Sequence, residues 1–181
     1  MAGANTSTDR MEAGDAIVEA MVKGGVECLF FNSGTELVFF QEAIAKARAQ
    51  GRKAPRLVTM IHENPSLNAA MGYAAASGKP AATAAHVDVG TQHYASAVHS
   101  AWRAALPVLI TAGAPPVGMP GSRRGARDAP HFWLQDMFDQ NGIVRQYMKW
   151  DHRLEFQDNP GLVVSRAIQV ACAPPAGPVY L

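Results

Sequence analysis

The sequence predicts an α/β protein in which three αβα layers surround a mostly parallel, doubly wound sheet of about six strands. Short apolar segments alternate with longer segments in which apolar residues recur at helical spacing, which is the pattern of βαβ units. The short segments, such as residues 26–31, are apolar almost throughout, as in a sheet that helices cover on both faces. Apolar residues make up 48% of the 181 residues, which is enough for the core of one domain.

The first half of the chain supplies clear start and stop signals. An apolar stripe that includes Ile17 and Met21 predicts a helix that ends at Gly24. Thr35 is a possible N-cap, and Pro65 occupies a position that the first turn of a helix tolerates. In order, the expected elements are a helix at residues 9–25, a strand at 26–31, a helix at 36–51, a strand at 56–61, a helix from about 65 to 78 and a strand at 81–87.

The second half contains a segment that we expect to be irregular, residues 114–133, because it is rich in proline, glycine and arginine. Strand-like and helix-like segments continue to alternate on both sides of it. The sequence contains no internal repeat. The expected elements are a helix from about Gln92 to Ala105, a strand at 107–113, a short helix at 134–142, a strand at 144–150, a helix at 159–172 and a strand that begins at 178.

Charge and cysteine content narrow the class of protein. Lys and Arg number 16 and Asp and Glu 15, so with a net charge of +1 we expect no binding to nucleic acid or to membranes. No segment approaches the roughly 18 uninterrupted apolar residues of a membrane helix. Cys28 and Cys172 lack metal-ligand spacing and indicate a reducing compartment, which predicts a cytoplasmic location. Residues 1–8 lack the apolar segment of a signal peptide, and we expect a flexible tail before one domain at 9–181.

Four loops of the predicted sheet follow the carboxyl ends of strands, where ligands bind in such folds. They are residues 32–36, 62–65, 87–93 and 112–116. The second loop contains Glu63, and no further charge follows until Lys79. This carboxylate either stabilises the start of the next helix or, in apolar surroundings, has a raised pKa and handles a proton. The small residues at 68–76 would let a flat ligand or another backbone approach closely.

Together, four segments resemble a known domain. They are residues 25–36, 62–82, 86–91 and 107–113. In order and spacing they are similar to the pyrimidine-binding (PYR) domain of thiamine diphosphate enzymes, and most similar to the group of acetolactate synthase, benzoylformate decarboxylase and pyruvate oxidase. The resemblance covers residues 9–181, and residues 62–80 are its most specific part.

The resemblance implies roles for individual residues. Glu63 takes the place of the catalytic glutamate that hydrogen-bonds the aminopyrimidine ring of the cofactor and places a proton there. Ser33 replaces a proline of the family pattern, and His93 stands where asparagine is common. The remaining matches are cofactor-binding positions and one substrate-proximal glutamine: Gly34, Thr35, Gly90, Thr91, His93 and Gln135.

The same resemblance implies that this chain holds only the pyrimidine half of thiamine diphosphate. The sequence lacks the GDG motif and the later asparagines with which the diphosphate-binding (PP) domain of these enzymes holds Mg²⁺. We therefore expect Mg²⁺ on a PP domain that another chain or a missing C-terminal part supplies. We also expect a small 2-oxo acid as substrate and a homodimer or larger assembly, because PYR and PP domains meet across subunits in this family.

Alternative functions remain open at this point. The preferred one is the PYR component of a thiamine diphosphate-dependent 2-oxo acid decarboxylase or carboligase, which would not be active alone. The second is a non-catalytic PYR-like binding or assembly module. A flavodoxin-like nucleotide binder is disfavoured, because no G-x-G-x-x-G motif follows the first strand.

The other polar groups are weaker candidates. His86 and Asp88 form an H-x-D pair, but without a third ligand we expect no metal site on this chain. His62 precedes Glu63 and, in a strand, would point to the opposite face. Three arginines of the irregular segment either clamp an acidic ligand or are simply solvated: Arg123, Arg124 and Arg127.

Overall fold

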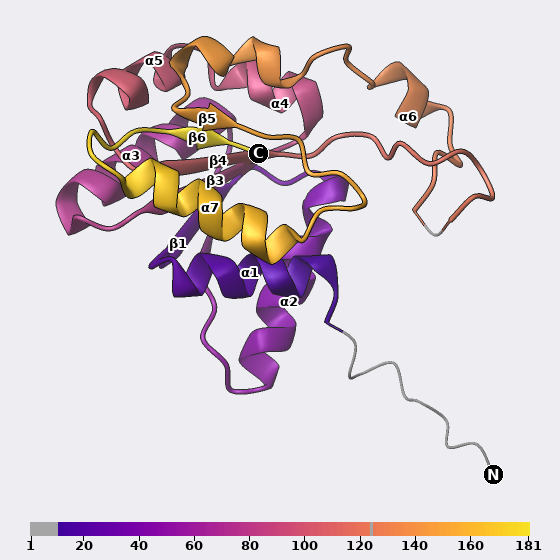
Figure 1. Cartoon of the computed structure of the whole chain (residues 1–181), viewed down its shortest axis with the longest axis horizontal. Coiled ribbons are helices and arrows are strands. Elements are labelled where there is room, and N and C mark those ends of the chain that lie inside the picture. Colours follow the sequence, from indigo (N-terminus) through magenta and orange to yellow (C-terminus); the bar gives the residue numbers. More distant parts are fainter. Residues whose placement is uncertain (1–10, 124) are drawn as a thin grey trace.

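The computed structural model describes residues 11–123 and 125–181, so the tail expected at residues 1–8 lies outside the described part. Within the described residues, six strands form one sheet in the order β2-β1-β3-β4-β6-β5. Their bounds are β1 Cys28–Phe31, β2 Arg56–Thr59, β3 Ala81–Ala85, β4 Val108–Ala112, β5 Trp150–Asp151 and β6 Val179–Tyr180. Every neighbouring pair is parallel, which confirms the α/β class (Figure 1).

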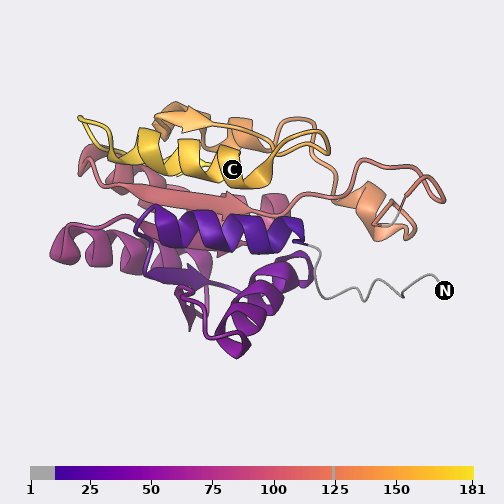
Figure 2. The same cartoon turned by 60° about the horizontal axis from the view of Figure 1, so that its bottom comes forward.

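Helices cover both faces of the sheet, so the three predicted layers are present (Figures 1 and 2). One face packs against α1 Ala13–Lys23, α2 Val38–Ala49 and α7 Pro160–Cys172, and the other against α3 Glu63–Ser77, α4 Val87–His93 and α5 Ala95–Arg103. Alternate residues of β1 serve the two cores, with Leu29 and Phe31 on the first face and Cys28 and Phe30 on the second. Burial on both sides explains why the strand segments are apolar throughout.

The strand order creates a switch point between β1 and β3. The chain leaves β1 through α2 to reach β2, and it returns through α3 to β3 on the other side of β1. These two connections lie on opposite faces of the sheet, so a crevice for ligands is expected at the carboxyl ends of β1 and β3. The Asn32 N–H donates to the Ala84 carbonyl at 3.3 Å and ties the two strand ends together.

Most boundaries in the first half agree with the prediction. Helix α1 ends at Gly24, and Gly25 has a φ of +86°, a conformation that favours glycine. Pro65 lies in the first turn of α3. Thr35 is not an N-cap, because it begins the 3-10 turn Thr35–Leu37, and Gly34 precedes that turn without a side-chain cap.

The next helix starts earlier than predicted. The sequence predicts a helix from about Gln92, whereas α4 begins at Val87 and a turn at Tyr94 separates it from α5. Val87 has a φ of +34°, which is rare for a β-branched residue. The spacing of apolar residues does not predict a helix that begins at such a residue. The predicted helix therefore becomes two helices, and the first of them reaches back to the end of β3.

The segment between β4 and β5 differs most from the prediction. Helix α6 His131–Leu134 ends where the sequence predicts a short helix at 134–142 to begin, and the strand predicted next is reduced to the 2 residues of β5. Two 3-10 turns occupy the residues between. The Arg145 guanidinium links both ends of this compact stretch, because it pairs with Asp139 at 2.7 Å and with Asp151 at 3.0 Å.

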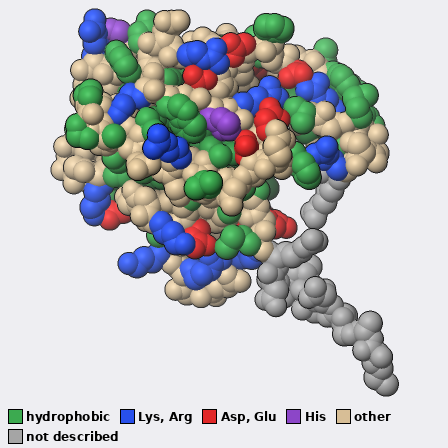
Figure 3. All heavy atoms as spheres, in the orientation of Figure 1, with side chains coloured by type: hydrophobic (Ala, Val, Ile, Leu, Met, Phe, Trp, Pro, Cys, Tyr) green, Lys and Arg blue, Asp and Glu red, His purple; other side chains and the backbone are tan. Residues whose placement is uncertain are grey.

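No helix in the described part of the chain combines the length and apolar character that a membrane crossing requires. Charges of both signs are interspersed on the face drawn in Figure 3, in keeping with the net charge of +1. The expectations about nucleic acid and membrane surfaces stay predictions.

Candidate functional site

Glu63 lies in a small polar group at the switch point. It is the first residue of α3, and it is only 3% exposed. Its Oε1 accepts a hydrogen bond from Asn32 Nδ2 at 3.0 Å, and its Oε2 is bonded to His93 Nδ1, also at 3.0 Å. The loop after β1, the start of α3 and the end of α4 therefore meet at one carboxylate.

Hydrogen bonds decide the charge of Glu63. Burial by itself raises the pKa of this carboxyl, whereas hydrogen bonds from Asn32, from the Glu63 backbone N–H and from His93 lower it. The lowering causes prevail, and the pKa lies below its ordinary value of 4.5. Of the two interpretations offered by the sequence, the raised pKa is therefore wrong, and Glu63 is an ionised hydrogen-bond acceptor at neutral pH.

Two histidines cover the exposed side of this carboxylate. The rings of His62 and His93 stack with their centroids 4.7 Å apart, and each side chain is about half exposed. His62 Nδ1 accepts a hydrogen bond from the Asn64 N–H at 3.2 Å, caps α3 and lies 3.9 Å from Glu63 Oε2. Because β2 ends at Thr59, His62 is not part of a strand and does not point away from Glu63.

Gly90 and Thr91, both predicted to bind the cofactor, lie in α4 in different surroundings. A Cβ added at Gly90 would lie 2.9 Å from the Ala85 Cβ and 3.1 Å from Glu63 Oε1, so only glycine fits between the end of β3 and the carboxylate. Thr91 is fully buried, and its hydroxyl lies 2.7 Å from the Tyr180 hydroxyl. The structure thus brings Gly90 and His93 to Glu63, while the Thr91 side chain lies in the core.

A second acid–histidine pair at this edge was missed by the sequence reasoning. Glu36 Oε2 and His86 Nδ1 lie 2.5 Å apart, and Glu36 Oε1 accepts a hydrogen bond from the Val87 N–H at 3.3 Å. Gly113 makes room for this acid, because an added Cβ would overlap the Glu36 side chain. The sequence suggested Asp88 as the companion of His86, but the real partner precedes it by 50 residues. The available signal was that both residues follow neighbouring strands.

A cavity of about 370 Å³ opens beside this pair. Thr35, Glu36 and Gln135 are among the residues that line it. Gly34 lies against His86, where an added Cβ would be 2.8 Å from the imidazole Nδ1. The predicted cofactor and substrate positions at Thr35 and Gln135 therefore share a hollow with Glu36, whereas Glu63 does not line it.

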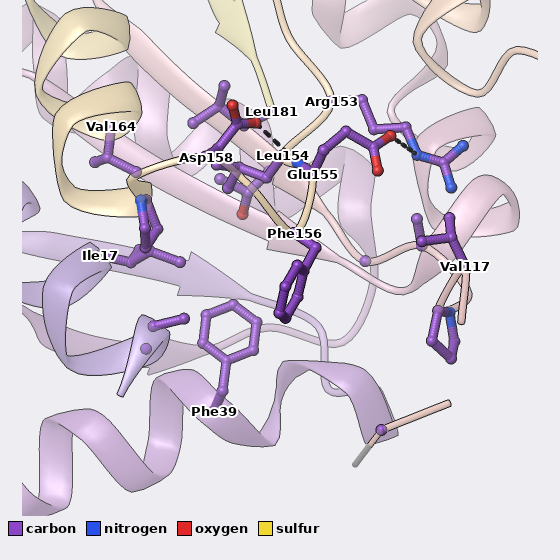
Figure 4. A pocket seen from close by; sticks show the side chains of 18 of the residues that line it. Ile17, Phe39, Val117, Arg153, Leu154, Glu155, Phe156, Asp158, Val164 and Leu181 are labelled. Atoms are coloured by element: carbon purple, nitrogen blue, oxygen red, sulfur yellow. Dashed lines mark hydrogen bonds and ion pairs between the residues drawn. The ribbon is translucent and has the colours of Figure 1, made fainter. Parts of the chain in front are cut away.

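A larger cavity, of about 1200 Å³, lies between α1, the start of α2 and residues 153–158 (Figure 4). Its lining is mostly apolar, and Phe156 points toward Phe39 in Figure 4. The Arg123 guanidinium lies 4.1 Å from the centroid of the Phe156 ring. Neither acid–histidine group contributes to this lining, so the larger cavity is separate from them.

Arg127 does not act as a free clamp for an acidic ligand. Its guanidinium pairs with Asp136 at 2.5 Å and lies 4.8 Å from the centroid of the Trp133 ring. The side chain is buried, so it fastens the segment between β4 and β5 to itself. Arg124 lies outside the described residues.

The fold and the acid at its switch point define an α/β domain of the kind in which ligands bind at the carboxyl edge of a parallel sheet. The family model described as "Thiamine pyrophosphate enzyme, N-terminal TPP binding domain" matches residues 11–143, and the chain belongs to this family. The resemblance noted from the four loops is confirmed.

Individual relatives agree with this family. The chain is 29% identical over 167 residues to benzoylformate decarboxylase of Pseudomonas aeruginosa, which covers 92% of this chain and 28% of the relative. It is 26% identical over 170 residues to acetolactate synthase 3, chloroplastic, of Brassica napus, covering 92% of this chain and 23% of the relative. The solved thiamine diphosphate-dependent 4-hydroxybenzoylformate decarboxylase of Rhodococcus jostii RHA1 shares the fold, with a TM-score of 0.76 at 20% identity over 94% of this chain and 29% of that one. The chain spans less than a third of the length of each.

Proposed function

We propose that this chain is the PYR-domain component of a thiamine diphosphate-dependent 2-oxo acid decarboxylase or carboligase. This class of reaction is supported by the similarity to one relative named as a decarboxylase and one named as an acetolactate synthase. Because the chain spans less than a third of their length, we infer that a PP domain comes from another chain or from the remainder of a longer protein.

The observation that carries this proposal is the buried, ionised Glu63 at the switch point. Asn32 fixes its Oε1, so Oε2 is the oxygen that can accept a hydrogen bond from a protonated ring nitrogen of an aminopyrimidine. Gly90 lets α4 lie directly against the carboxylate, and the half-exposed His93 can turn aside from Oε2. A fixed carboxylate acceptor behind a movable histidine suits a flat, nitrogen-rich heterocycle.

The chemistry divides between cofactor and protein. Thiamine diphosphate, when bound, supplies the electron sink that a 2-oxo acid needs in order to lose or exchange its carboxyl group. The role that we assign to Glu63 is to orient the pyrimidine ring and to accept or return a proton at its ring nitrogen. Mg²⁺ prefers oxygen ligands beside phosphates, and we assign it to the PP domain.

The Glu36–His86 pair gives the chain a second group that can handle a proton. Glu36 is hydrogen-bonded to Nδ1 of the His86 imidazole, which fixes the orientation of the ring. Nε2 is then the nitrogen that can exchange a proton with a substrate. The adjoining cavity contains Thr35 and Gln135 and has room for a small 2-oxo acid. We therefore assign contact with the substrate to this side of the edge.

One observation favours the alternative, a non-catalytic PYR-like binding or assembly module. Both oxygens of Glu63 already have partners within the chain, Asn32 and His93. In that case the carboxylate would serve the stability of the domain, and no ligand would need it.

Assembly into a dimer or a larger oligomer suits either function. Leu134 and Phe138 are 87% and 104% exposed, which is unusual for large apolar side chains in a monomer. The outer face of α3 presents small residues, and a Cβ added at Gly72 would meet no heavy atom within 4 Å. Both surfaces are available to a second protein surface.

The test is reconstitution with a PP-domain partner, followed by measurement of 2-oxo acid turnover. Glu63→Gln keeps the shape of the side chain but removes its charge, and we expect turnover to fall roughly 10²–10⁴-fold. Glu42→Gln, which changes an exposed acid of α2, is the matched control and should keep full activity. Unchanged turnover in a folded Glu63→Gln protein would favour the non-catalytic module.

A further inference from the structure

Three side chains that can bind a metal ion converge on the exposed side of Glu63. One ligand atom from each of His62, Glu63 and His93 lies within 4.8 Å of the other two. We propose that these residues bind one first-row transition-metal ion, with Zn²⁺ as the reference occupant. This site is distinct from the Mg²⁺ site that we assign to a PP domain.

The separations suit such an ion. Glu63 Oε2 lies 3.0 Å from His93 Nδ1 and 3.9 Å from His62 Nδ1. In a tetrahedral zinc site with bonds of ~2.0–2.2 Å, two ligand atoms lie about 3.3 Å apart. The observed distances fall on both sides of this value, so rotation of the two histidine side chains can bring both nitrogens to bonding distance.

The acid is the fixed part of the site, and the histidines are the adjustable part. Asn32 holds the other oxygen of buried Glu63, a contact of the kind that orients carboxylate ligands. Stacked rings cannot both direct their in-plane lone pairs at one ion, so His62 and His93 must rotate out of the stack. Their half exposure gives them room to rotate and leaves a coordination position to water. His62 then exchanges the Asn64 N–H for the ion.

The ligand set selects the class of ion. Two imidazoles and one carboxylate suit Zn²⁺, Co²⁺, Ni²⁺ and Cu²⁺, whereas Mg²⁺ prefers oxygen ligands alone. The sequence reasoning weighed His86 with Asp88, and His93 with His99, and predicted no metal site. It missed this one because 30 residues separate Glu63 from His93.

An ion at this site would compete with the cofactor. Asn32 occupies Oε1, so the ion and the aminopyrimidine would both need Oε2 of Glu63. A bound ion would then keep the PYR domain from engaging thiamine diphosphate. This competition rests on the proposed function, whereas the metal site itself does not.

Metal binding can be measured on the untagged chain by calorimetry with Zn²⁺ and by visible absorption with Co²⁺, whose spectrum reports the number and type of ligands. We expect one ion per chain, bound at least about tenfold more weakly in His62→Gln and in His93→Gln. His99→Gln is the matched control, since His99 is an exposed histidine of α5 outside the group, and it should bind as wild type does. Excess Mg²⁺ should not displace the ion.

Two results would overturn the site: no uptake of Zn²⁺ by the folded wild-type chain, or equal affinity in wild type, His62→Gln and His93→Gln. The competition is tested by repeating the Zn²⁺ titration with a PP-domain partner, Mg²⁺ and rising thiamine diphosphate. We expect the apparent Zn²⁺ affinity to fall in proportion to cofactor occupancy. An unchanged Zn²⁺ affinity beside bound cofactor would leave the metal site standing and would remove the contact between Glu63 and the cofactor.

Discussion

The two acid–histidine groups at the edge of the sheet are held in opposite ways. Glu63 is buried and anchored by Asn32, and its histidine, His93, is 46% exposed. Glu36 and His86 are 21% and 29% exposed and lie 2.5 Å apart. In the first group the surrounding fold fixes Glu63, and His93 can move away from it. In the second group the two side chains fix each other.

This difference shows how one edge can offer two kinds of chemistry. Asn32 and the Glu63 backbone N–H still hold the Glu63 carboxylate when His93 moves, so it can present Oε2 to a ligand. Glu36 has His86, the Val87 N–H and the space left by Gly113 as its support, so the pair acts as a unit. Substitutions should therefore separate the two groups.

Gly113→Ala should have the largest effect on stability. It should disturb the Glu36–His86 group and leave the Glu63 group unchanged. The added Cβ would overlap Glu36 Cγ, and overpacking of this kind lowers the free energy of unfolding by about 3 kcal/mol. Chemical denaturation measures the loss. Gly72→Ala is the matched control, because its Cβ enters open space and loss of a helix glycine stabilises by about 0.5–1 kcal/mol. Equal stability of both variants would mean that Glu36 does not need its present position.

Asn32→Ala should instead disturb the group around Glu63. It leaves Oε1 of a buried carboxylate without its donor, which costs about 2 kcal/mol of the free energy of unfolding at neutral pH. Asn68→Ala removes an exposed asparagine of α3 and serves as the control. If both variants unfold at the same denaturant concentration, Asn32 is not the anchor of Glu63.

The pH dependence of stability sharpens the same comparison. The pKa of Glu63 in the folded chain lies below its ordinary 4.5, so the carboxylate contributes stability that is present above the unfolded pKa and lost as pH falls through the folded pKa. Without Asn32 the folded pKa rises, and the loss begins at a higher pH. Urea unfolding of wild type and Asn32→Ala, from neutral pH down to about 3, should give curves that converge toward acid. Parallel curves would contradict the anchoring role.

The sequence predicts what depends on local composition. The apolar strand at 26–31, the helix break at Gly24 and an acid after the second strand can all be read from neighbouring residues. The partners of the acids cannot, because His93 and His86 reach Glu63 and Glu36 across 30 and 50 residues through the strand order. The raised pKa that the sequence offered as one interpretation of Glu63 fails for the same reason. Burial can be expected from neighbouring residues, whereas the contacts from Asn32 and His93 cannot.

Substitutions of the two histidines should have the smallest effects on stability, and they compare the two groups most directly. His93→Gln should change the free energy of unfolding by less than about 1 kcal/mol, because a half-exposed pair contributes little and Asn32 still holds Glu63. His86→Gln should cost about 1–2 kcal/mol, because Glu36 is left with a backbone donor alone. Double-mutant cycles with Glu63→Gln and Glu36→Gln measure the two couplings, and we expect the Glu36–His86 coupling to be the larger. A larger coupling between Glu63 and His93 would mean that the histidine, rather than the fold, holds the acid in place.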